Sequence, residues 1–359
     1  MPDRAGGATA VRRRRLALAG YGAVGQALTT LLVRAADELA DRHAPAFDVT
    51  AVATRRAGLL VDPFGVDQER LAALSLATTP IPPGKWPDLA AFLADPAAPY
   101  DVLVEVTTQS PRDGEPAASH LRAALRSGRG VVTANKGPIA WHEAELRRLA
   151  AASGARLRYE AALMDCLPTH AIRESIVPVG RVVSFAGIVN ATTNAILSAM
   201  AEGRGAAEAL ADAQRAGLAE ADPRNDTEGH DAALKATILA NLLLDPAEPL
   251  TPDAVDRRGL EAVPGAWPAE AAGRGARVRL VARGETLGEG PGREVRVRVR
   301  PEELPLSDSL ATVGGTSMGL RIESEYGGQL QLTLLGAPVE ATAYAILMDL
   351  VALERTPRG

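Results

Sequence analysis

Residues 16–32, LALAGYGAVGQALTTLL, place a Gly-rich turn between a short apolar run and a segment with helical spacing. Gly20, Gly22 and Gly25 form the pattern G-x-G-x-x-G. In this pattern the first glycine permits the tight turn, the second lets the backbone approach a pyrophosphate, and the third lets helix and strand pack closely. The stretch therefore predicts a strand, a turn and a helix, with a dinucleotide held at the helix N-terminus.

The same alternation continues to about residue 155. Strands are expected at 16–19, 47–53, 102–106 and 131–134, and helices at 26–40, 116–126 and 141–152. Strands that alternate with helices indicate a parallel sheet covered on both faces. The predicted class is α/β, with a Rossmann-like nucleotide-binding domain.

The second half of the chain has a different pattern. Strands are expected at 182–189, 276–282 and 295–300, and a hairpin of 320–325 and 329–335 around Gly327 and Gly328. Helices are expected at 194–200 and 206–216, from about residue 229 onward, and at 341–353. Residues 244–267 are a Pro-rich connection that carries little information. This half predicts an α+β domain.

The composition is that of a globular protein, since 47% of the 359 residues are hydrophobic and 23% are charged. The length allows two domains. A net charge of −5 argues against a nucleic-acid partner. The single cysteine, Cys166, excludes an internal disulfide and suits a reducing compartment.

The arginines at 12–15 precede an apolar run and resemble the start of an export signal. We reject that interpretation because glycines interrupt the run at once. No apolar run reaches the roughly 18 residues needed to span a bilayer. We therefore expect no membrane partner and a cytoplasmic protein.

The end of the second expected strand bears on the choice of cofactor. An NAD-binding protein is expected to have an acidic residue there for the ribose hydroxyls, but this chain has Thr54, Arg55 and Arg56. Guanidinium groups favour a 2′-phosphate, so we predict NADP, with NAD as the alternative. The two arginines are otherwise a solvated surface pair. Ala23 and Val24, inside the Gly-rich turn, are further candidates for cofactor contact.

Lysine is rare in this chain, which has only three lysines among 39 cationic residues. An ammonium can exchange a proton near neutrality when its surroundings shift its pKa, whereas a guanidinium cannot. Lys136 and Asn135 follow one expected strand, and Thr107 and Thr108 follow another, so all four reach the carboxyl edge where ligands of such sheets bind. We predict that Lys136 transfers the proton during hydride transfer. The alternative is an ordinary surface lysine.

A second polar segment, AEADPRNDTEGHDAALK at 219–235, contains Glu220, Asp226, Asp231 and Lys235. Asp231 and Lys235 are four residues apart on an expected helix and share a face. A solvated ion pair is one interpretation, and a metal site is another, although no paired His or Cys ligands accompany the acids. The loop could instead bind a substrate ammonium.

Taken together, these motifs resemble the homoserine dehydrogenase family over nearly the whole ordered chain. They occur in the family's order as GYGAVG at 20–25, VTANKGP at 132–138, YEA at 159–161, NATTNAIL at 190–197, AEADP and EGHDAALK within 219–235, and EATAYAILMDL at 340–350. The resemblance implies reversible oxidation of L-homoserine to L-aspartate 4-semialdehyde with NAD(P), in amino-acid biosynthesis. It also implies a homodimer whose second domain supplies the substrate site and the interface.

By position, Lys136 and Lys235 match the family's two active-site lysines, Glu220 and Asp231 its substrate-binding acids, and Thr107 a contact near the nicotinamide. We expect Lys136 to act as general acid/base and Lys235, positioned by Asp231, to orient the substrate oxygen, although the roles could be exchanged. Thr192 and Asp226 are further candidates for substrate binding, and Gly336 for cofactor binding. A monovalent cation would be held by main-chain carbonyls at Glu160 and Leu163.

The chain departs from the family pattern around the substrate. It has MDCLP at 164–168 where the family has a pattern such as MAGTP, Ala191 in place of a glycine, and Leu218 in place of a frequent tyrosine. LLGAP at 334–338 replaces GPGAG. These changes leave open a dehydrogenase of another hydroxy or oxo amino acid, or an NADP-binding protein without turnover.

The expected organisation is a disordered tail at 1–11, a dinucleotide-binding domain at 12–155, and a substrate-binding and dimerisation domain at 156–325. Residues 326–359 are expected to return to the nucleotide domain. We expect no appended regulatory domain, and therefore no feedback through such a module.

Overall fold

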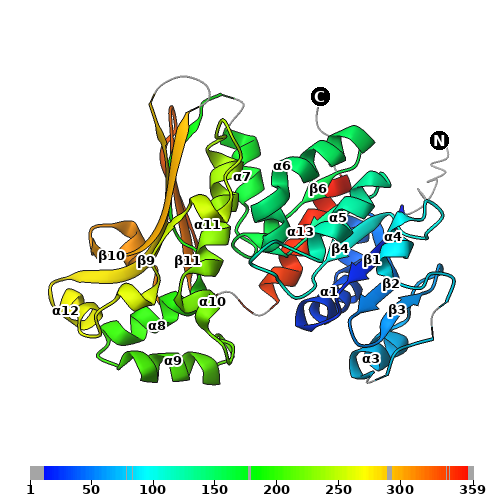
Figure 1. Ribbon diagram of the computed structural model, residues 1–359, viewed down its shortest axis with the longest axis horizontal. Helices are drawn as coiled ribbons and strands as arrows, with labels where there is room; N and C mark the ends of the chain where they lie inside the picture. Colours follow the sequence, from blue (N-terminus) through cyan, green and yellow to red (C-terminus); the bar gives the residue numbers. More distant parts are fainter. Residues whose placement is uncertain are drawn as a thin grey trace, which may run out of the picture.

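The computed structural model describes residues 12–354, except 78, 83, 177–178, 289–292, 337 and 339. The expected tail at 1–11 lies outside the described residues. Two six-stranded sheets, each packed with helices, form two lobes (Figure 1). No helix in the described part of the chain combines the length and the apolar character needed to cross a membrane.

The first sheet has the strand order β3-β2-β1-β4-β5-β6. Its strands are β1 (Arg13–Ala19), β2 (Ala46–Thr54), β3 (Gly58–Val61), β4 (Val102–Glu105), β5 (Gly130–Thr133) and β6 (Leu157–Arg158). All neighbours pair in parallel except β2 and β3, which pair antiparallel. The predicted parallel sheet is confirmed, and β3 is an edge strand that the sequence analysis missed.

The helices of this lobe are α1 (Ala23–Arg34), α2 (Ala36–Asp41), α3 (Gln68–Leu76), α4 (Leu89–Ala94), α5 (Ala117–Arg126) and α6 (Lys136–Ser153). The helix expected at 26–40 is in fact two, separated at Ala35. α6 begins at Lys136 rather than at residue 141, because the Asn135 side chain accepts a hydrogen bond from the Gly137 amide at 3.3 Å and caps the helix. Lys136 is therefore a first-turn residue.

The second sheet has the order β12-β11-β7-β9-β10-β8 and is antiparallel apart from β8 with β10. Its strands are β7 (Val182–Ile188), β8 (Asp256–Arg257), β9 (Ala276–Leu287), β10 (Glu294–Pro305), β11 (Met318–Ser324) and β12 (Gly328–Leu334). The other elements of the second half are α7 (Thr169–Ile176), α8 (Ala191–Ala201), α9 (Ala206–Arg215), α10 (Arg224–Thr227), α11 (His230–Leu243), α12 (Trp267–Gly273) and the 3-10 turns η1 (Glu160–Ala162), η2 (Pro252–Ala254), η3 (Leu260–Ala262) and η4 (Ser309–Thr312).

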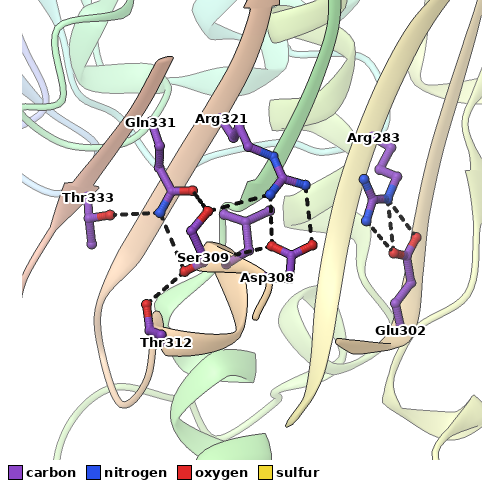
Figure 2. Close-up of polar contacts among 9 residues, drawn as sticks. Arg283, Glu302, Asp308, Ser309, Thr312, Arg321, Gln331 and Thr333 are labelled. Carbon is purple, nitrogen blue, oxygen red and sulfur yellow. Dashed lines mark hydrogen bonds and ion pairs between the residues drawn. The ribbon is translucent and has the colours of Figure 1, made fainter. Parts of the chain in front are cut away.

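The two faces of the second sheet differ. Leu320 and Ile322 of β11 belong to the hydrophobic core shared with α8 and α11. Arg321 lies between them and points to the opposite face, where it pairs with Asp308 at 2.8 Å. On the same face Arg283 of β9 pairs with a β10 carboxylate, Glu302, at 2.7 Å (Figure 2). This outer face is therefore lined by paired charges.

The C-terminal part of the chain belongs to both lobes. The expected boundary after residue 325 falls inside the hairpin of β11 and β12, and β12 stays in the second sheet because its backbone pairs with β11. α13 (Ala341–Glu354) packs on α1 in the first lobe. Glu354 at its end pairs with Arg12 and Arg14 at 2.8 and 2.7 Å. Among the described elements after residue 325, α13 is thus the one that returns to the first lobe.

Candidate active site

Two lysines from different lobes meet at one carboxylate. Lys136 Nζ lies 3.5 Å from Asp231 Oδ1, and Lys235 Nζ lies 3.2 Å from Asp231 Oδ2. Asp231 is 7% exposed and Lys235 is 8% exposed. The expectation that the lysines of the two motifs converge is therefore met by the geometry.

Packing between α6 and α11 brings these groups together. Lys136 is the first residue of α6, and Asp231 is the second residue of α11, so both lie in first turns. Lys235 follows Asp231 by one helical turn on the same face. Gly229 starts α11 from a left-handed conformation, φ +77°, which glycine adopts without strain.

Asn190 belongs to this group of residues and was not predicted. Its Nδ2 donates hydrogen bonds to Asp231 Oδ2 at 2.9 Å and to Asp226 Oδ1 at 2.8 Å. Its Oδ1 accepts from the Thr193 amide at 2.8 Å and caps α8. The sequence did contain a signal for it. Asn190 is the first residue of NATTNAIL and lies between a strand and a helix, where an N-terminal capping residue is expected. We call Lys136, Asn190, Asp226, Asp231 and Lys235 the lysine cluster.

The surrounding charges decide the ionisation of the two acids. Burial by itself would raise the pKa of Asp231, but the ammonium groups of Lys235 and Lys136 and the hydrogen bonds from Asn190 and Lys235 outweigh burial and hold that pKa well below its usual range. Burial, together with the negative charge of Asp231, raises the pKa of Asp226. Asp231 is thus the fixed anion between the two cations.

The two lysines are held differently. Lys235 Nζ donates to the Val189 carbonyl at 2.7 Å and is also close to Asp231, and its side chain is 10% exposed. Lys136 Nζ donates to Gln109 Oε1 at 3.3 Å, and its side chain is 20% exposed. Neither Val189 nor Gln109 was predicted, because nothing in their residue types singles them out. Lys235 is the more firmly fixed of the two.

The remaining substrate candidates lie outside this group of contacts. Thr192 is buried in the first turn of α8, and its hydroxyl donates to the Leu218 carbonyl at 2.8 Å. Glu220 is exposed on the connection between α9 and α10. The structure does not bring Glu220 into the lysine cluster.

The Gly-rich turn at residues 20–25, the cofactor turn, has the geometry that a pyrophosphate needs. Gly20 has φ +99°, and a Cβ there would lie 2.6 Å from the Val106 carbonyl oxygen, so only glycine fits. A Cβ at Gly25 would lie 3.1 Å from the Gly20 carbonyl oxygen. At Gly22, which is exposed and starts α1, a Cβ would meet nothing within 4 Å. The backbone is thus open to an anion where Ala23 and Val24 begin the helix.

The other cofactor candidates surround this turn. The Gly20 amide donates to the Ala53 carbonyl at 2.9 Å, which joins the turn to the end of β2, and the exposed Arg55 and Arg56 follow directly. Asn135 Nδ2 donates to the Thr107 carbonyl at 3.4 Å, whereas Thr108 is exposed. Gly336 is exposed with φ +53°.

The cation prediction concerns main-chain oxygens of η1 and the residue after it. The Glu160 carbonyl accepts from the Leu163 amide at 3.0 Å, and its carboxylate accepts from the Thr169 and His170 amides at 2.7 and 3.0 Å. Among the described residues no three or more His, Cys, Asp and Glu side chains form a group that could hold a metal ion. A cation held by the Glu160 and Leu163 carbonyls stays a prediction.

The MDCLP departure is visible in the structure. Asp165 has φ +50°, and its Oδ1 accepts a hydrogen bond from the Thr342 hydroxyl of α13 at 2.9 Å. Leu167 is buried in the core rather than exposed to a ligand. Burial raises the pKa of the Cys166 thiol, so the thiolate is disfavoured.

The cofactor turn and the lysine cluster fall within regions that match known families. Residues 20–160 match the family model "Homoserine dehydrogenase, NAD binding domain", and residues 168–351 match the model "Homoserine dehydrogenase". The domain that contains the cofactor turn thus binds a nicotinamide cofactor.

Relatives that match nearly the whole chain indicate the same family. An NAD(+)-dependent homoserine dehydrogenase of Pseudomonas canavaninivorans is 34% identical over 95% of this chain and 96% of its own length. A homoserine dehydrogenase of Methanocaldococcus jannaschii is 30% identical over 93% of this chain and 96% of its own. The crystal structure of a homoserine dehydrogenase from Thiobacillus denitrificans has a TM-score of 0.80 and 29% identity over 96% of this chain and 73% of its own. That of the Thermoplasma acidophilum enzyme has a TM-score of 0.76 and 26% identity over 95% and 99%. The chain therefore belongs to the homoserine dehydrogenase family of NAD(P)-dependent oxidoreductases.

Proposed function

We propose that this enzyme interconverts L-homoserine and L-aspartate 4-semialdehyde with NADP. The observation that carries the proposal is the pair of ammonium groups on either side of the ionised Asp231, at the carboxyl edge of the first sheet. Oxidation of a primary alcohol needs a group that takes the hydroxyl proton and a donor that fixes the oxygen. The two lysines supply both.

Lys136 is the proton-transfer group in this proposal. Its contacts with Asp231 and Gln109 are long, at 3.5 and 3.3 Å, so it is held more loosely than Lys235 and can reach a substrate hydroxyl. As the C4–H bond of homoserine breaks, Lys136 takes the hydroxyl proton and the C4–O bond becomes a carbonyl. A nicotinamide cofactor held at the cofactor turn would supply the hydride acceptor, and the hydride donor in the reverse reaction.

Lys235 orients the substrate oxygen. Two acceptors, Val189 O and Asp231 Oδ2, hold its ammonium at 2.7 and 3.2 Å and leave one N–H for the substrate. A donor fixed in advance stabilises the negative charge that develops on the oxygen during transfer. The opposite assignment would require the better-held lysine to give up its charge.

The acids beside the lysines bind the amino-acid part of the substrate. Asp226 is linked to Asp231 through Asn190 and faces the same group of charges. Glu220 lies on the exposed connection between α9 and α10. We assign the substrate ammonium to Asp226, with Glu220 and Thr192 at the edge of the site.

The cofactor preference is proposed as NADP because Arg55 and Arg56 stand at the end of β2, where no carboxylate is present to bind ribose hydroxyls. In the double variant Arg55→Ala, Arg56→Ala, the Kd for NADPH should rise about 10-fold or more. The Kd for NADH should stay the same. An equal loss for both cofactors would contradict the assignment.

We further propose a homodimer in which the outer face of the second sheet meets its copy. This face carries arginines and carboxylates side by side, among them Arg283, Glu302, Asp308 and Arg321 (Figure 2). Interspersed charges of both signs suit an isologous contact, where each charge meets its opposite across the two-fold axis. Light scattering should then give twice the 37.4 kDa of one chain.

The decisive experiment follows NADPH formation by absorbance with L-homoserine, other hydroxy amino acids and no substrate. We expect turnover with homoserine above all analogues. Faster turnover of another hydroxy amino acid would support the alternative substrate suggested by MDCLP. NADPH binding without any turnover would support a non-catalytic protein and contradict the proposal.

A further inference from the structure

Glu105 is the last residue of β4, and its side chain is 0% exposed. The Thr107 amide donates to Glu105 Oε1 at 3.2 Å, and the Thr107 hydroxyl donates to the same oxygen. The carboxylate thus holds the turn that leaves β4. Thr107 is the residue expected nearest the nicotinamide.

The other carboxylate oxygen faces the next strand. The Thr133 hydroxyl, at the end of β5, lies 3.4 Å from Glu105 Oε2 and 3.2 Å from the Glu105 carbonyl oxygen. The Asn135 amide in turn donates to the Thr133 hydroxyl at 3.0 Å. Because Asn135 caps α6 and Lys136 is the next residue, the contacts of Glu105 extend to the start of the catalytic helix.

A second link closes this network. Asn135 Nδ2 donates to the Thr107 carbonyl at 3.4 Å, so the turns after β4 and β5 are joined both through Glu105 and directly. Together these contacts tie Thr107, the residue expected nearest the nicotinamide, to Asn135, the residue that precedes Lys136. We call Glu105, Thr107, Thr133 and Asn135 the turn network.

A carboxylate at this position is costly for a strand end whose preceding residues, Val102, Leu103 and Val104, are apolar and buried. A carboxylate buried among apolar residues is destabilised unless hydrogen bonds replace its lost hydration. The only nearby cationic candidate among the described residues is His120, whose Nδ1 lies 3.7 Å from Oε1 and makes no hydrogen bond.

We propose that Glu105 is a positioning residue of the dehydrogenase reaction. It fixes the two turns relative to each other and so sets the distance between the nicotinamide ring and the Lys136 amine. This inference rests on the function proposed above. Glu105 does not touch substrate in this account and acts only through Thr107, Thr133 and Asn135.

The expected signature is a loss of turnover without a matching loss of binding. A misplacement of about 1 Å in a reacting group can cost about 100-fold in rate, whereas cofactor affinity is dominated by contacts at the cofactor turn. In Glu105→Gln, kcat should fall about 10- to 100-fold, and the KM for homoserine and the Kd for NADPH should change less than about threefold. The primary isotope effect on kcat with homoserine deuterated at C4 should rise, because hydride transfer becomes rate-limiting.

The second variant is Thr133→Val, which keeps the shape of the side chain and removes the hydroxyl that links Glu105 to Asn135. This variant should also lower kcat while changing the KM for homoserine and the Kd for NADPH much less. The control is Glu145→Gln, which neutralises a carboxylate on the surface of α6 that pairs with Arg122 at 3.0 Å. All kinetic constants of the control should equal those of the wild type. Circular dichroism and Tm confirm that each variant is folded.

Several results would overturn the inference. If the wild type oxidises homoserine while Glu105→Gln and Thr133→Val both keep kcat within threefold, the turn network does not position Lys136. If both variants lose NADPH affinity as strongly as kcat, Glu105 supports the nucleotide site in general. If Glu105→Gln does not fold, Thr133→Val alone decides. If the wild type shows no turnover with homoserine, the proposed function fails first, and the positioning role fails with it.

Discussion

The cofactor turn and the lysine cluster differ in how they are built and in the chemical groups that they offer. The turn consists of six consecutive residues, is exposed at Gly22 and Ala23, and offers backbone amides at a helix start. The cluster joins residues far apart in the chain, is buried at Asn190, Asp231 and Lys235, and offers charged side chains that hold one another. The proposed anion site is thus built locally from backbone, whereas the proposed proton-transfer site requires charges that only packing between the lobes can bring together.

Replacing Lys136, the proposed proton-transfer group, tests the cluster most severely. In Lys136→Arg, kcat should fall by about 10³-fold, because a guanidinium stays protonated and cannot take the hydroxyl proton. The Kd for NADPH, measured by fluorescence, should stay the same. Lys85→Arg is the matched control, because Lys85 is exposed and pairs only with Asp95 at 3.2 Å among the described acids. Unchanged turnover in Lys136→Arg would transfer the proton-transfer role to Lys235.

The cofactor turn offers a matched pair of glycines. Gly20→Ala should destabilise the protein by about 2–4 kcal/mol, because its Cβ would meet the Val106 carbonyl oxygen at 2.6 Å with φ +99°. Gly22→Ala has space and should keep its Tm, yet lose NADPH affinity because its methyl group occupies the approach of the pyrophosphate. Thermal unfolding and NADPH titration separate the two effects. Equal Tm losses would mean that both glycines serve the fold alone.

Asn190 tests whether the cluster depends on neutral hydrogen bonds as well as on charges. Asn190→Ala removes two donors to carboxylates and the cap of α8, so the free energy of unfolding should fall by about 2 kcal/mol. The KM for homoserine should rise because Asp226 loses its anchor. The control is Asn194, another asparagine of α8, whose side-chain amide donates to main-chain carbonyls and not to carboxylates. Asn194→Ala should leave the KM for homoserine unchanged. The reverse pattern would exclude Asn190 from the site.

The smallest expected effect concerns the pH dependence of stability. Since the pKa of Asp226 is raised in the folded state by burial and by Asp231, the unfolded chain loses this proton first as pH rises from about 4. The stability contributed by the protonated form is therefore present below the unfolded pKa and lost as pH rises through the folded pKa. Asp226→Asn should thus gain Tm relative to the wild type as pH rises from 4 to 7. A constant difference across that range would show that Asp226 does not titrate as proposed.

Several features of the fold followed from local sequence, and others did not. The G-x-G-x-x-G turn and the parallel strands were predictable because glycine positions and apolar runs act within a few residues. β3, α3 and α4 were missed because each is short and weakly periodic. Asp67 and Asp88 cap α3 and α4, and each accepts a hydrogen bond from a backbone amide at 2.8 Å. An aspartate at an N-cap position is a sequence signal for a helix start, so this part was predictable. α6 starts earlier than expected because Asn135 caps it, and the sequence analysis did not identify Asn135 as an N-terminal cap.

The sequence alone identified the candidates for chemistry here: two rare lysines, an acidic helix start, and a turn that needs glycine at position 20. Tertiary structure alone decided that Lys136 and Lys235 share Asp231, that Asn190 bridges two carboxylates, and that Glu105 faces Thr133 of the next strand. Helix and turn signals depend on neighbours in the chain. The ionisation of a buried carboxylate depends on every charge within a few ångströms, and those charges come from segments that meet only when the two lobes pack.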